Sequence, residues 1–517
     1  MENYRLMNIQ RLLVFSLVFF ILGLGAQEDI DFHLKHSASF SFENSVPLIR
    51  VHIKNYKSGV KMSGLSSFKC NKKSIKADSI QVVTNKFTPS VTKYKLSFQE
   101  ISHSQLKGYT ILVDEWKKRT GKNVTIYVSG AIFSINKSRI DNREYFITME
   151  ELLEKKAAQK LLANFRVRYP SYNISLIPIL TSTSSSKTTV KTKNGSFECT
   201  NSIELSLKDS LVIGEDKYEN SGGFFIVPSS SQNISLAKEA SIEKLVERIL
   251  PGEMFLSAPL ETLKAQAVAA RTDIFMQLGK RHESQPWHIC SEVHCQKVIW
   301  GKEIQKKFLQ AVNETKGEII LYDGSYVARA PYCSSAGGHT EDIRNVWITA
   351  EKKYLKGIWD GDKPLDLNLR RESDLETFLN TDYGEDNIKM NKRHRWKKDI
   401  TFEEMDKHLQ KFKLGKIKKL VAIKRGVSGR IYKMRFEGTK GKKIIHGELN
   451  IRRLLGNMNS SSFIVRKLRN KWAFKGMGWG HGVGMSQIGA ISLGRKSKTY
   501  KYILKRYYPG TEVKSLY

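Results

Sequence analysis

A single carboxylate, Glu253, stands just ahead of the most strongly patterned helical segment of the chain, residues 260–278. At 100° per residue, this segment has an apolar stripe on one side and polar residues on the other. Lys264 and Arg271 project within about 40° of the apolar stripe. A cation placed there must find an anion, because an unpaired buried charge costs several kcal/mol. Candidate partners of Arg271 are Glu253 and a carboxylate on a ligand; a purely structural ion pair beneath the helix is the alternative.

Residues 288–295 (HICSEVHC) concentrate two cysteines and two histidines. Thiolates and imidazoles suit zinc, and four such ligands form a closed structural site. We therefore predict a structural zinc site from Cys290, His294, Cys295 and His288, with His294 as the preferred histidine. A Cys290–Cys295 disulfide is the alternative, because disulfides persist in exported proteins.

Two glycine-containing segments supply further groups that can meet a ligand. In residues 332–340 (YCSSAGGHT), small residues after a predicted strand let backbone N–H groups come close to a ligand, although a polar turn is the alternative. In residues 476–490 (GMGWGHGVGMSQIGA), alternating glycines make the backbone approachable, and Trp479 offers a face for stacking a sugar. A dinucleotide site is excluded because no strand precedes the glycines as that fold requires. The predicted substrate-binding residues are Lys264, Arg271, Tyr332, Ser334, Ser335, Gly337, Trp479, His481, Ser486 and Gln487.

Length, charge and the first residues restrict the function. The chain has 517 residues, of which 40% are hydrophobic, and a net charge of +35, so it is a folded protein that attracts polyanions. Residues 1–26 have a basic start, a thirteen-residue apolar run and small residues, which predicts a secretory signal, with a retained anchor as the alternative. Export places the chain in the periplasm, the cell wall or the medium. It also favours an acidic wall polymer over nucleic acid as the partner.

The elements that position these residues mix helices with antiparallel strands in no βαβ order, which predicts an α+β fold. Residues 27–190 form a predicted smaller α+β or β-rich accessory module, a candidate glycan-binding unit, and the polar run 181–193 is a predicted linker or exposed hairpin. Residues 195–517 form the catalytic region. Helices are expected at 148–165, with a Thr148–Glu151 capping box, at 260–278, and at 402–412, with a Thr401–Glu404 capping box. Strands are expected at 75–84, 93–99, 109–114, 124–128, 319–322, 326–332, 419–427 and 431–436, with a turn at Gly429.

The order of these motifs resembles a known family. Glu253-Met254, the string LETLKAQAVAART, His294-Cys295-Gln296, YCSSAGGHT, GWGHGVGMSQIGA and a terminal YYPGT occur in the order typical of the stage II sporulation protein D / amidase enhancer (SpoIID/LytB) family. The resemblance covers residues 240–517. Phe255 replaces the proline that often follows Glu-Met in the family.

The resemblance implies a peptidoglycan lytic transglycosylase that cuts between N-acetylmuramic acid and N-acetylglucosamine and leaves a 1,6-anhydro ring. It implies glycan strands stripped of stem peptides as the substrate, and therefore coupling to a cell-wall amidase. The catalytic acid falls on Glu253, the family's helix arginine on Arg271, and the zinc loop on Cys290–Cys295, with no organic cofactor. The alternative is a non-catalytic, wall-binding modulator of an amidase.

One carboxylate suffices for this chemistry, because the C6 hydroxyl of the sugar replaces water as the nucleophile. A general acid that works at neutral pH needs a raised pKa, and a neighbouring cation lowers it. We therefore expect that Arg271 does not contact Glu253. Instead, Arg271 is expected to bind the lactyl carboxylate of a stripped muramic acid or another protein carboxylate.

Overall fold

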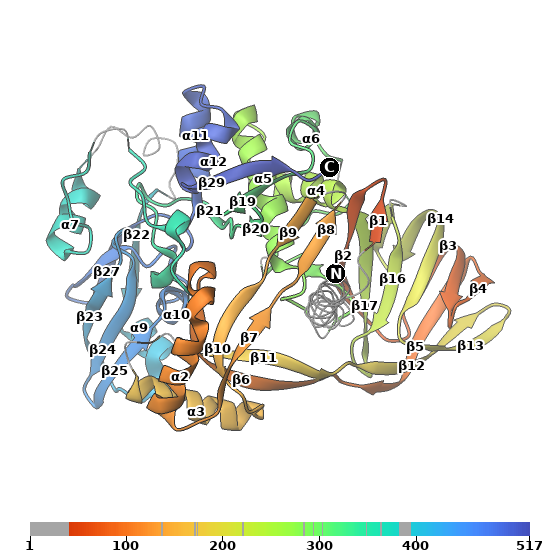
Figure 1. Cartoon of the computed structure of the whole chain (residues 1–517), viewed down its shortest axis with the longest axis horizontal. Coiled ribbons are helices and arrows are strands. Elements are labelled where there is room, and N and C mark those ends of the chain that lie inside the picture. The colour runs from red at the N-terminus through yellow and green to blue at the C-terminus, as the bar shows by residue number, and fades with distance from the viewer. Residues whose placement is uncertain are drawn as a thin grey trace, which may run out of the picture.

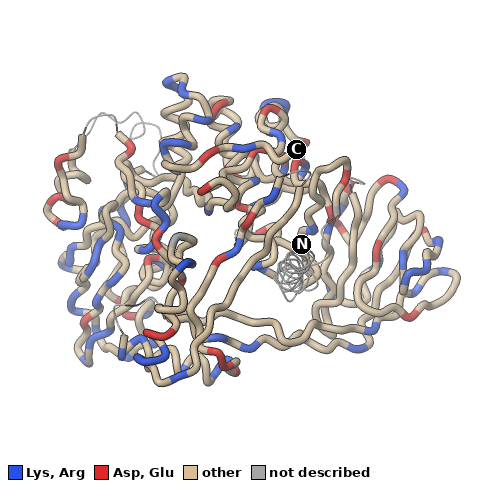
Figure 2. Tube along the Cα trace, in the orientation of Figure 1, with Lys and Arg blue, Asp and Glu red and all other residues tan. Residues whose placement is uncertain are grey.

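The computed structural model describes residues 41–517, apart from 136–137, 170–171, 173, 220–221, 283–284, 293, 302, 348, 362–363 and 382–393. The predicted signal segment at 1–26 lies outside the described residues. Among the helices of the described part, none is both long enough and apolar enough to cross a membrane. Helices combine with several mostly antiparallel sheets, which confirms the predicted α+β class. Lys and Arg are spread along the whole described trace (Figure 2).

The largest sheet lies at one end of the molecule (Figure 1). In β5, Ile80, Val82 and Thr84 are buried and their neighbours are more exposed, as expected for a strand with one face on a core. In sheet order the strands are β1 (Ser41–Glu43), β2 (Val46–Lys57), β17 (Asn233–Ser241), β16 (Phe224–Pro228), β14 (Ile203–Ile213), β3 (Lys61–Cys70), β5 (Ser79–Thr88), β12 (Ser185–Thr192) and β13 (Gly195–Thr200), with β15 (Asp216–Glu219) on β14, β4 (Lys73–Lys76) on β3 and β18 (Ile289–Cys290) on β2.

This sheet continues across the boundary that the sequence suggested between 190 and 195. That position lies in the turn between β12 and β13, which pair with each other. Farther along the sheet, β2 pairs with β17, and a Cys70–Cys199 disulfide joins β3 to β13. The polar run 181–193 is therefore not a linker, because its strand β12 pairs with β5 inside the sheet, but the alternative of a hairpin is confirmed by the pairing of β12 with β13.

A smaller α+β unit packs its own core between a sheet and two helices (Figure 1). Its sheet has the order β11 (Ser175–Ser182), β6 (Val91–Ile101), β10 (Glu144–Met149) and β7 (Val124–Ser129), and its helices are α2 (Tyr109–Thr120) and α3 (Lys155–Arg168). Two expectations were wrong here. The strand expected at 109–114 is the start of α2, because Val113 and Trp116 are buried at helical spacing. Thr148 lies in β10 with its side chain buried between neighbouring strands, so the Thr148–Glu151 capping box does not form and α3 begins later.

The central core surrounds α5 (Leu260–Gln277), whose predicted bounds are confirmed to within one residue. Alanine and leucine favour this helix, and most of its residues are buried on all sides. The helices around it are α4 (Ile242–Glu253), α6 (Lys306–Asn313), α11 (Gln487–Arg495) and α12 (Tyr500–Tyr507). The sheet beside it has the order β29 (Thr511–Ser515), β19 (Glu318–Tyr322), β20 (Tyr326–Val327), β9 (Ser138–Asp141) and β8 (Ile132–Ile135).

The far end of the molecule carries two small sheets with their own core (Figure 1). The Thr401–Glu404 capping box forms, and Gly429 has a φ of 73° in the turn between two paired strands, so both predictions are confirmed. The strands are β22 (Arg395–Thr401), β27 (Lys471–Met477) and β26 (Phe463–Lys467) in one sheet, and β23 (Ile417–Arg425), β24 (Ile431–Gly438) and β25 (Gly441–His446) in the other. The helices are α7 (Glu372–Asn380), α9 (Phe402–Leu409) and α10 (Glu448–Leu454).

Candidate functional site

A cleft of about 910 Å³ opens where the end of α4, one side of α5, the 294–297 segment and the glycine-rich segment meet. It brings together side chains that are far apart in the sequence, such as Glu253 and Gln487, which are separated by 234 residues. The predicted site residues that line it are Glu253, His294, Cys295, Tyr332, Ser334, Trp479, His481 and Gln487.

Glu253 is the last residue of α4, and its carboxyl is half-buried in the cleft. Burial, with a smaller contribution from the nearby Asp273, raises its pKa to about 7. Hydrogen bonds from the Lys297 backbone and the Gln487 side chain act in the opposite direction but do not outweigh burial. The carboxyl end of a helix also disfavours a negative charge. Glu253 is therefore about half protonated at pH 7, where an ordinary glutamate is almost fully ionised.

The backbone next to Glu253 leaves no room for a side chain. A Cβ added to Gly252 would lie 2.7 Å from the carbonyl oxygen of Lys297. This close approach holds the end of α4 against the 294–297 segment, which also donates the backbone hydrogen bond to Glu253. The acid is therefore fixed by two segments that are far apart in the sequence.

The polar side of α5 forms one wall of the cleft. Gln277 donates a hydrogen bond to the carboxyl of Asp273, and Gln296 donates another at 2.7 Å. The hydroxyl of Tyr332 donates to the side-chain carbonyl of the same Gln296. Burial raises the pKa of Asp273 and of Tyr332, and the carboxyl of Glu253 adds to the rise for Tyr332. This wall consequently disfavours negative charge.

Aromatic side chains form the rim of the cleft. Trp347 and Trp479 are 37% and 39% exposed, which is unusual for tryptophan and suits the stacking of a sugar ring. The His481 ring lies 4.8 Å from the Trp347 ring and accepts a hydrogen bond from the Val483 backbone N–H at 3.0 Å. Burial lowers the pKa of His481 to about 3, so its imidazole is neutral.

The two glycine-containing segments lie side by side, which explains their composition. Tyr332–Cys333 (β21) pairs with Met485–Ser486 (β28), and the Ser335 and Trp479 backbones exchange hydrogen bonds at 3.2 and 2.8 Å. The fully buried Arg430 donates to the Ala336 carbonyl at 3.1 Å. A Cβ added to Gly482 would lie 2.2 Å from the guanidinium carbon of Arg430. At Gly482 a glycine is thus needed because the Arg430 side chain packs against its backbone.

Arg271 does not reach the cleft. Its guanidinium is fully buried and makes a bidentate pair with Glu243 of α4, at 3.0 and 2.7 Å, and donates to the Glu318 carbonyl at 2.9 Å. The expectation that Arg271 avoids Glu253 and binds another protein carboxylate is confirmed. Its assignment to the substrate is wrong, because no face of the guanidinium is exposed. Lys264 likewise lies outside the cleft, in ion pairs with Glu261 at 2.7 Å and Glu314 at 2.5 Å.

Three other predicted substrate contacts, Ser335, Gly337 and Ser486, do not line the cleft and support its loops instead. Ser486 caps α11 by accepting from the Gly489 N–H at 3.3 Å, and it also accepts from the Ala336 N–H at 3.2 Å. The buried Ser335 hydroxyl accepts from the Gly337 N–H at 3.2 Å. These residues shape the loops that carry Ser334 and Trp479 and do not line the cleft themselves.

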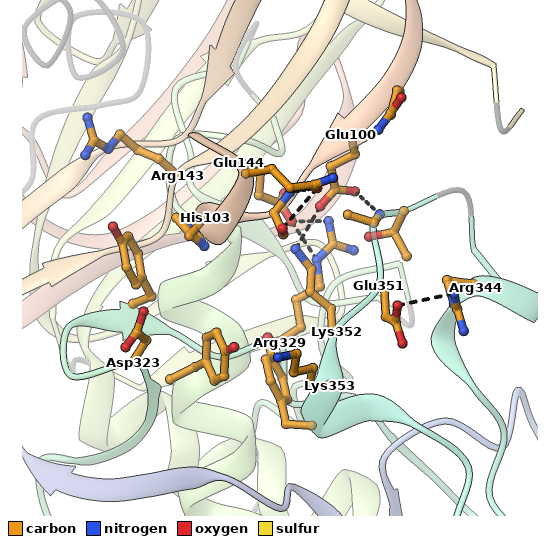
Figure 3. Close-up of a pocket in the computed structure, with 18 of the residues that line it drawn as sticks. Glu100, His103, Arg143, Glu144, Asp323, Arg329, Arg344, Glu351, Lys352 and Lys353 are labelled. Atoms are coloured by element: carbon orange, nitrogen blue, oxygen red, sulfur yellow. Dashed lines mark hydrogen bonds and ion pairs between the residues drawn. The ribbon is translucent and has the colours of Figure 1, made fainter. Parts of the chain in front are cut away.

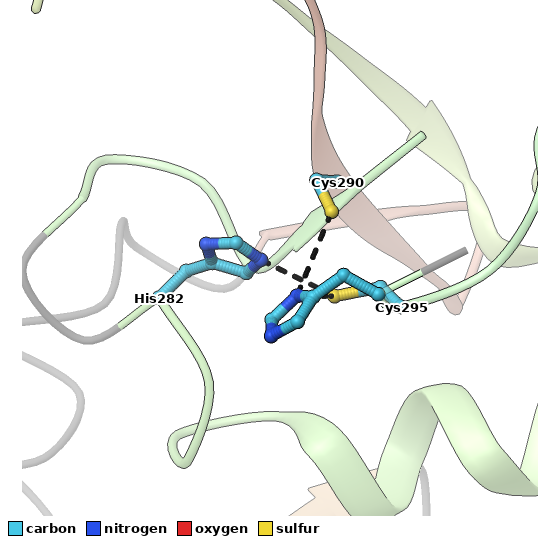
Figure 4. A group of neighbouring side chains, drawn as sticks. His282, Cys290 and Cys295 are labelled. Carbon is cyan, nitrogen blue, oxygen red and sulfur yellow. Dashed lines mark hydrogen bonds between the residues drawn. The ribbon is translucent and has the colours of Figure 1, made fainter. Parts of the chain in front are cut away.

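The cysteines and histidines beside the cleft gather into one cluster (Figure 4). The ligand atoms of His282, Cys290, His294 and Cys295 all lie within 4.8 Å of one another. Cys295 Sγ is 3.2 Å from His282 Nε2 and 3.4 Å from His294 Nδ1, close to the roughly 3.5 Å spacing of ligands in tetrahedral zinc sites. The other ring nitrogen of His282 is hydrogen-bonded to Gln285 at 2.5 Å, as is usual for a metal-bound histidine. This donor set can hold a metal ion.

His288 is not part of this cluster. Its Nδ1 accepts from the Arg50 backbone N–H at 3.0 Å, which fixes it against β2. His282 takes the predicted place of His288, since a chain reversal with a positive φ of 57° at His282 returns it towards Cys295. Cys290 and Cys295 are free thiols, so the alternative Cys290–Cys295 disulfide does not form, and the disulfide of the described chain is Cys70–Cys199.

Several cleft residues were missed by the sequence reasoning. Asp273 and Gln277 lie on the polar side of the predicted helix, but their positions alone do not distinguish a cleft from solvent. Trp347 and Gln296 lie in irregular segments without a spacing pattern. Cations also line the cleft: Lys280, Arg281, Lys297 and Arg329.

Comparisons with known proteins agree with this arrangement. Residues 230–322 match the family described as stage II sporulation protein, and residues 341–484 match a domain of unknown function, DUF8618. An uncharacterized protein of Brachyspira hyodysenteriae is 28% identical over 312 residues, which cover 60% of this chain and 76% of that protein. The amidase enhancer of Bacillus subtilis is 28% identical over 52% of this chain and 40% of its own length.

Stage II sporulation protein D of Bacillus subtilis is 26% identical over 293 residues, which cover 53% of this chain and 74% of that protein. The family match at 230–322 contains Glu253, all of α5 and the metal cluster, which are central parts of the site. By these matches and by its motifs, residues 230–322 carry a stage II sporulation protein domain, and the chain is similar to stage II sporulation protein D and the amidase enhancer.

Proposed function

We propose that this protein is an exported peptidoglycan lytic transglycosylase that cleaves the bond between N-acetylmuramic acid and N-acetylglucosamine. The observation that supports this most strongly is Glu253, a carboxyl whose pKa is raised to about 7 in a cleft with a tryptophan rim. A protonated acid beside a sugar-stacking surface is what glycosidic bond cleavage requires.

In the proposed reaction, the Glu253 proton passes to the bridging oxygen as the bond from the muramic acid C1 to that oxygen breaks. The C6 hydroxyl oxygen of the same sugar then bonds to C1, and its proton passes to the Glu253 carboxylate. A 1,6-anhydro ring forms, no water is consumed, and Glu253 is protonated again. A second carboxylate in the role of nucleophile is not needed.

Charge in the cleft favours a glycan strand whose stem peptides have been removed. Such a strand carries free lactyl carboxylates on its muramic acid residues. Four cations, Lys280, Arg281, Lys297 and Arg329, line the cleft beside one ionised carboxylate, Glu144, which pairs with Lys280 and Arg329, whereas the carboxyls of Glu253 and Asp273 have raised pKa values. Arg281 is an exposed guanidinium at this wall and takes the carboxylate-binding role that the sequence had assigned to Arg271. An amidase that removes stem peptides would supply this substrate.

The metal in the cluster is proposed to be zinc, held by His282, Cys290, His294 and Cys295. Two thiolates and two imidazoles suit zinc in a closed structural site. Its contribution would be to fix the 282–295 segment, because His294 and Cys295 also line the cleft. The proton transfers stay with Glu253.

Export remains part of the proposal. The predicted signal at residues 1–26 supports it, and so does the Cys70–Cys199 disulfide, because disulfides persist in oxidising compartments. The protein is accordingly placed in the periplasm, in the wall or outside the cell.

The test compares the products of the parent protein and of Glu253→Gln on amidase-treated sacculi by mass spectrometry. The parent is expected to release 1,6-anhydro products, and Glu253→Gln to lose at least about 100-fold in rate. Glu247→Gln is the matched control, because it removes a carboxylate from the same helix outside the cleft. Equal yields from parent and Glu253→Gln would contradict the enzyme and favour a non-catalytic modulator of an amidase.

A further inference from the structure

A second cavity, of about 560 Å³, lies between the smaller α+β unit and the central core (Figure 3). One wall comes from β6, the turn η1 (His103–Gly108) and β10, and the opposite wall comes from β20 and the 349–354 segment. Its volume is within the range of small-molecule sites. The β6, η1 and β10 residues lie outside both family matches, at 230–322 and 341–484.

Two buried polar atoms in this cavity have no hydrogen-bond partner within the described structure. They are Nε2 of His103 and Oγ1 of Thr349. A buried polar group without a partner costs about 1–3 kcal/mol and is rare in folded proteins. Both atoms are closed to solvent, and both belong to residues that line one cavity, on opposite walls.

The chemistry of the two atoms defines the ligand. The other ring nitrogen of His103 is hydrogen-bonded to the Arg143 backbone, and burial lowers the pKa of His103, so the ring is neutral and Nε2 is an acceptor. The Thr349 hydroxyl can both donate and accept. Hydroxyl groups on a ligand match both atoms, whereas a carboxylate offers no proton to Nε2.

Neighbouring contacts hold both groups in place before any ligand binds. The His103 ring packs on the Tyr326 ring, with 3.6 Å between their centroids. The buried carboxylate of Glu100 accepts from the Ala350 N–H at 3.0 Å and from Lys352 Nζ at 2.8 Å, which fixes the segment that carries Thr349. Groups that are already ordered lose less entropy when they bind a ligand.

Tyrosine rings and two ion pairs form a further part of the lining, which also carries the charged side chains of Arg143, Asp323, Arg344, Glu351 and Lys353. Tyr322 and Tyr354 lie with their ring centroids 4.9 Å apart, and both line the cavity. In the wall, Glu100 pairs with Lys352 and Glu144 pairs with Arg329, so that the charges within each pair neutralise each other (Figure 3). Tyrosine faces with a few neutral hydrogen-bonding groups suit a sugar ring.

The cavity adjoins the catalytic cleft, since Glu144, Met276 and Arg329 line both. We propose that it binds further sugar residues of the glycan strand whose scissile bond lies in the cleft. This inference rests on the proposed function. The smaller α+β unit would then make binding depend on the length of the glycan strand, so that long strands bind more tightly than short ones.

The test measures binding in the Glu253→Gln background, where turnover is suppressed, with peptide-free glycan strands of long and short defined length. His103→Ala combined with Thr349→Val removes two hydrogen bonds and is expected to weaken long-strand binding about tenfold. Binding of a short oligosaccharide that fills only the cleft should change less than about twofold. Thr148→Val is the matched control, because Thr148 also has a buried unpartnered hydroxyl but lies outside both cavities.

A structural role is separated from a binding role by stability. Replacing the unpartnered Thr349 hydroxyl with a methyl group should leave the free energy of unfolding unchanged or raise it, because no hydrogen bond is lost. Long-strand binding equal to that of the background would overturn the inference, as would equal losses for long and short glycans. Products that depend on Glu253 would leave the proposed function intact in either case, whereas a lack of binding to any glycan would contradict both.

Discussion

The Arg271 guanidinium and the Glu243 carboxylate form a fully buried bidentate pair that joins α5 to α4, the helix that ends at Glu253. The same carboxylate accepts from the Gly317 N–H at 3.0 Å and from the Tyr517 hydroxyl. The pair therefore connects four segments of the core, one of which is the helix that ends at Glu253. Arg271, which the sequence suggested for substrate binding, therefore acts on Glu253 only indirectly, by anchoring the helix that carries it.

Arg271→Lys should destabilise the protein without damaging the cleft. The substitution keeps the charge but loses the planar fork, and we expect a loss of about 2–3 kcal/mol in the free energy of unfolding. Denaturant unfolding measures this value. Lys264→Met is the control, because its more exposed ion pairs should be worth about 1 kcal/mol or less. If the Arg271→Lys protein were as stable as the parent but bound glycan more weakly, Arg271 would bind the substrate, and this prediction would be wrong.

Activity should fall as pH rises through about 7, because cleavage needs the protonated form of Glu253. The pH dependence of kcat/KM on peptide-free glycan measures this in the free enzyme. Asp273→Asn removes a carboxyl that raises the pKa of Glu253, so it should move the falling limb to lower pH. A limb that stays in place in Asp273→Asn, or activity that rises above pH 7, would be inconsistent with this role.

The raised pKa of Glu253 also predicts a pH-dependent stability. A carboxyl with a higher pKa in the folded state stabilises the protein below its unfolded pKa of 4.5, and this contribution is lost as pH rises towards 7. The shift corresponds to less than about 3.5 kcal/mol, and partial exposure reduces it further. Glu253→Gln cannot ionise, so above pH 7 it should unfold at a higher temperature than the parent. A lower melting temperature for Glu253→Gln at pH 8 would disagree with a buried, proton-retaining acid.

Metal content should depend on His282 and not on His288. Protein purified without added zinc is expected to contain about one equivalent, which His282→Ala and Cys290→Ser should remove. His288→Ala should retain the metal, because His288 bonds to the Arg50 backbone instead. Elemental analysis of the three variants decides this. Equal zinc in His282→Ala and in the parent would exclude this ligand set.

Sequence patterns predicted those parts of the site that local chemistry determines. Glu253, the glycine strings and the helix at 260–278 are visible because composition and period mark them. His282 was missed because it lies six residues upstream of the HICSEVHC string, and only the turn of the chain brings it to Cys295.

The contents of the N-terminal half were harder to predict, for physical reasons. A helix such as α2 and a strand such as β12 depend on partners distant in sequence. The polar composition of 181–193 does not indicate a strand, yet β12 lies between β5 and β13 in the sheet. Trp347 becomes part of the rim only because the folded chain places it beside His481. The spacing of residues along the sequence does not indicate contacts of this kind, which only the folded chain creates.

The central claim, that the pKa of Glu253 is raised to about 7, is tested most directly by titrating its side chain. Carbon-13 NMR of protein labelled at the glutamate carboxyl would identify the Glu253 signal as the one that is missing in Glu253→Gln. We predict a midpoint at about pH 7. A midpoint near 4.5, the value of a freely hydrated glutamate, would contradict the account.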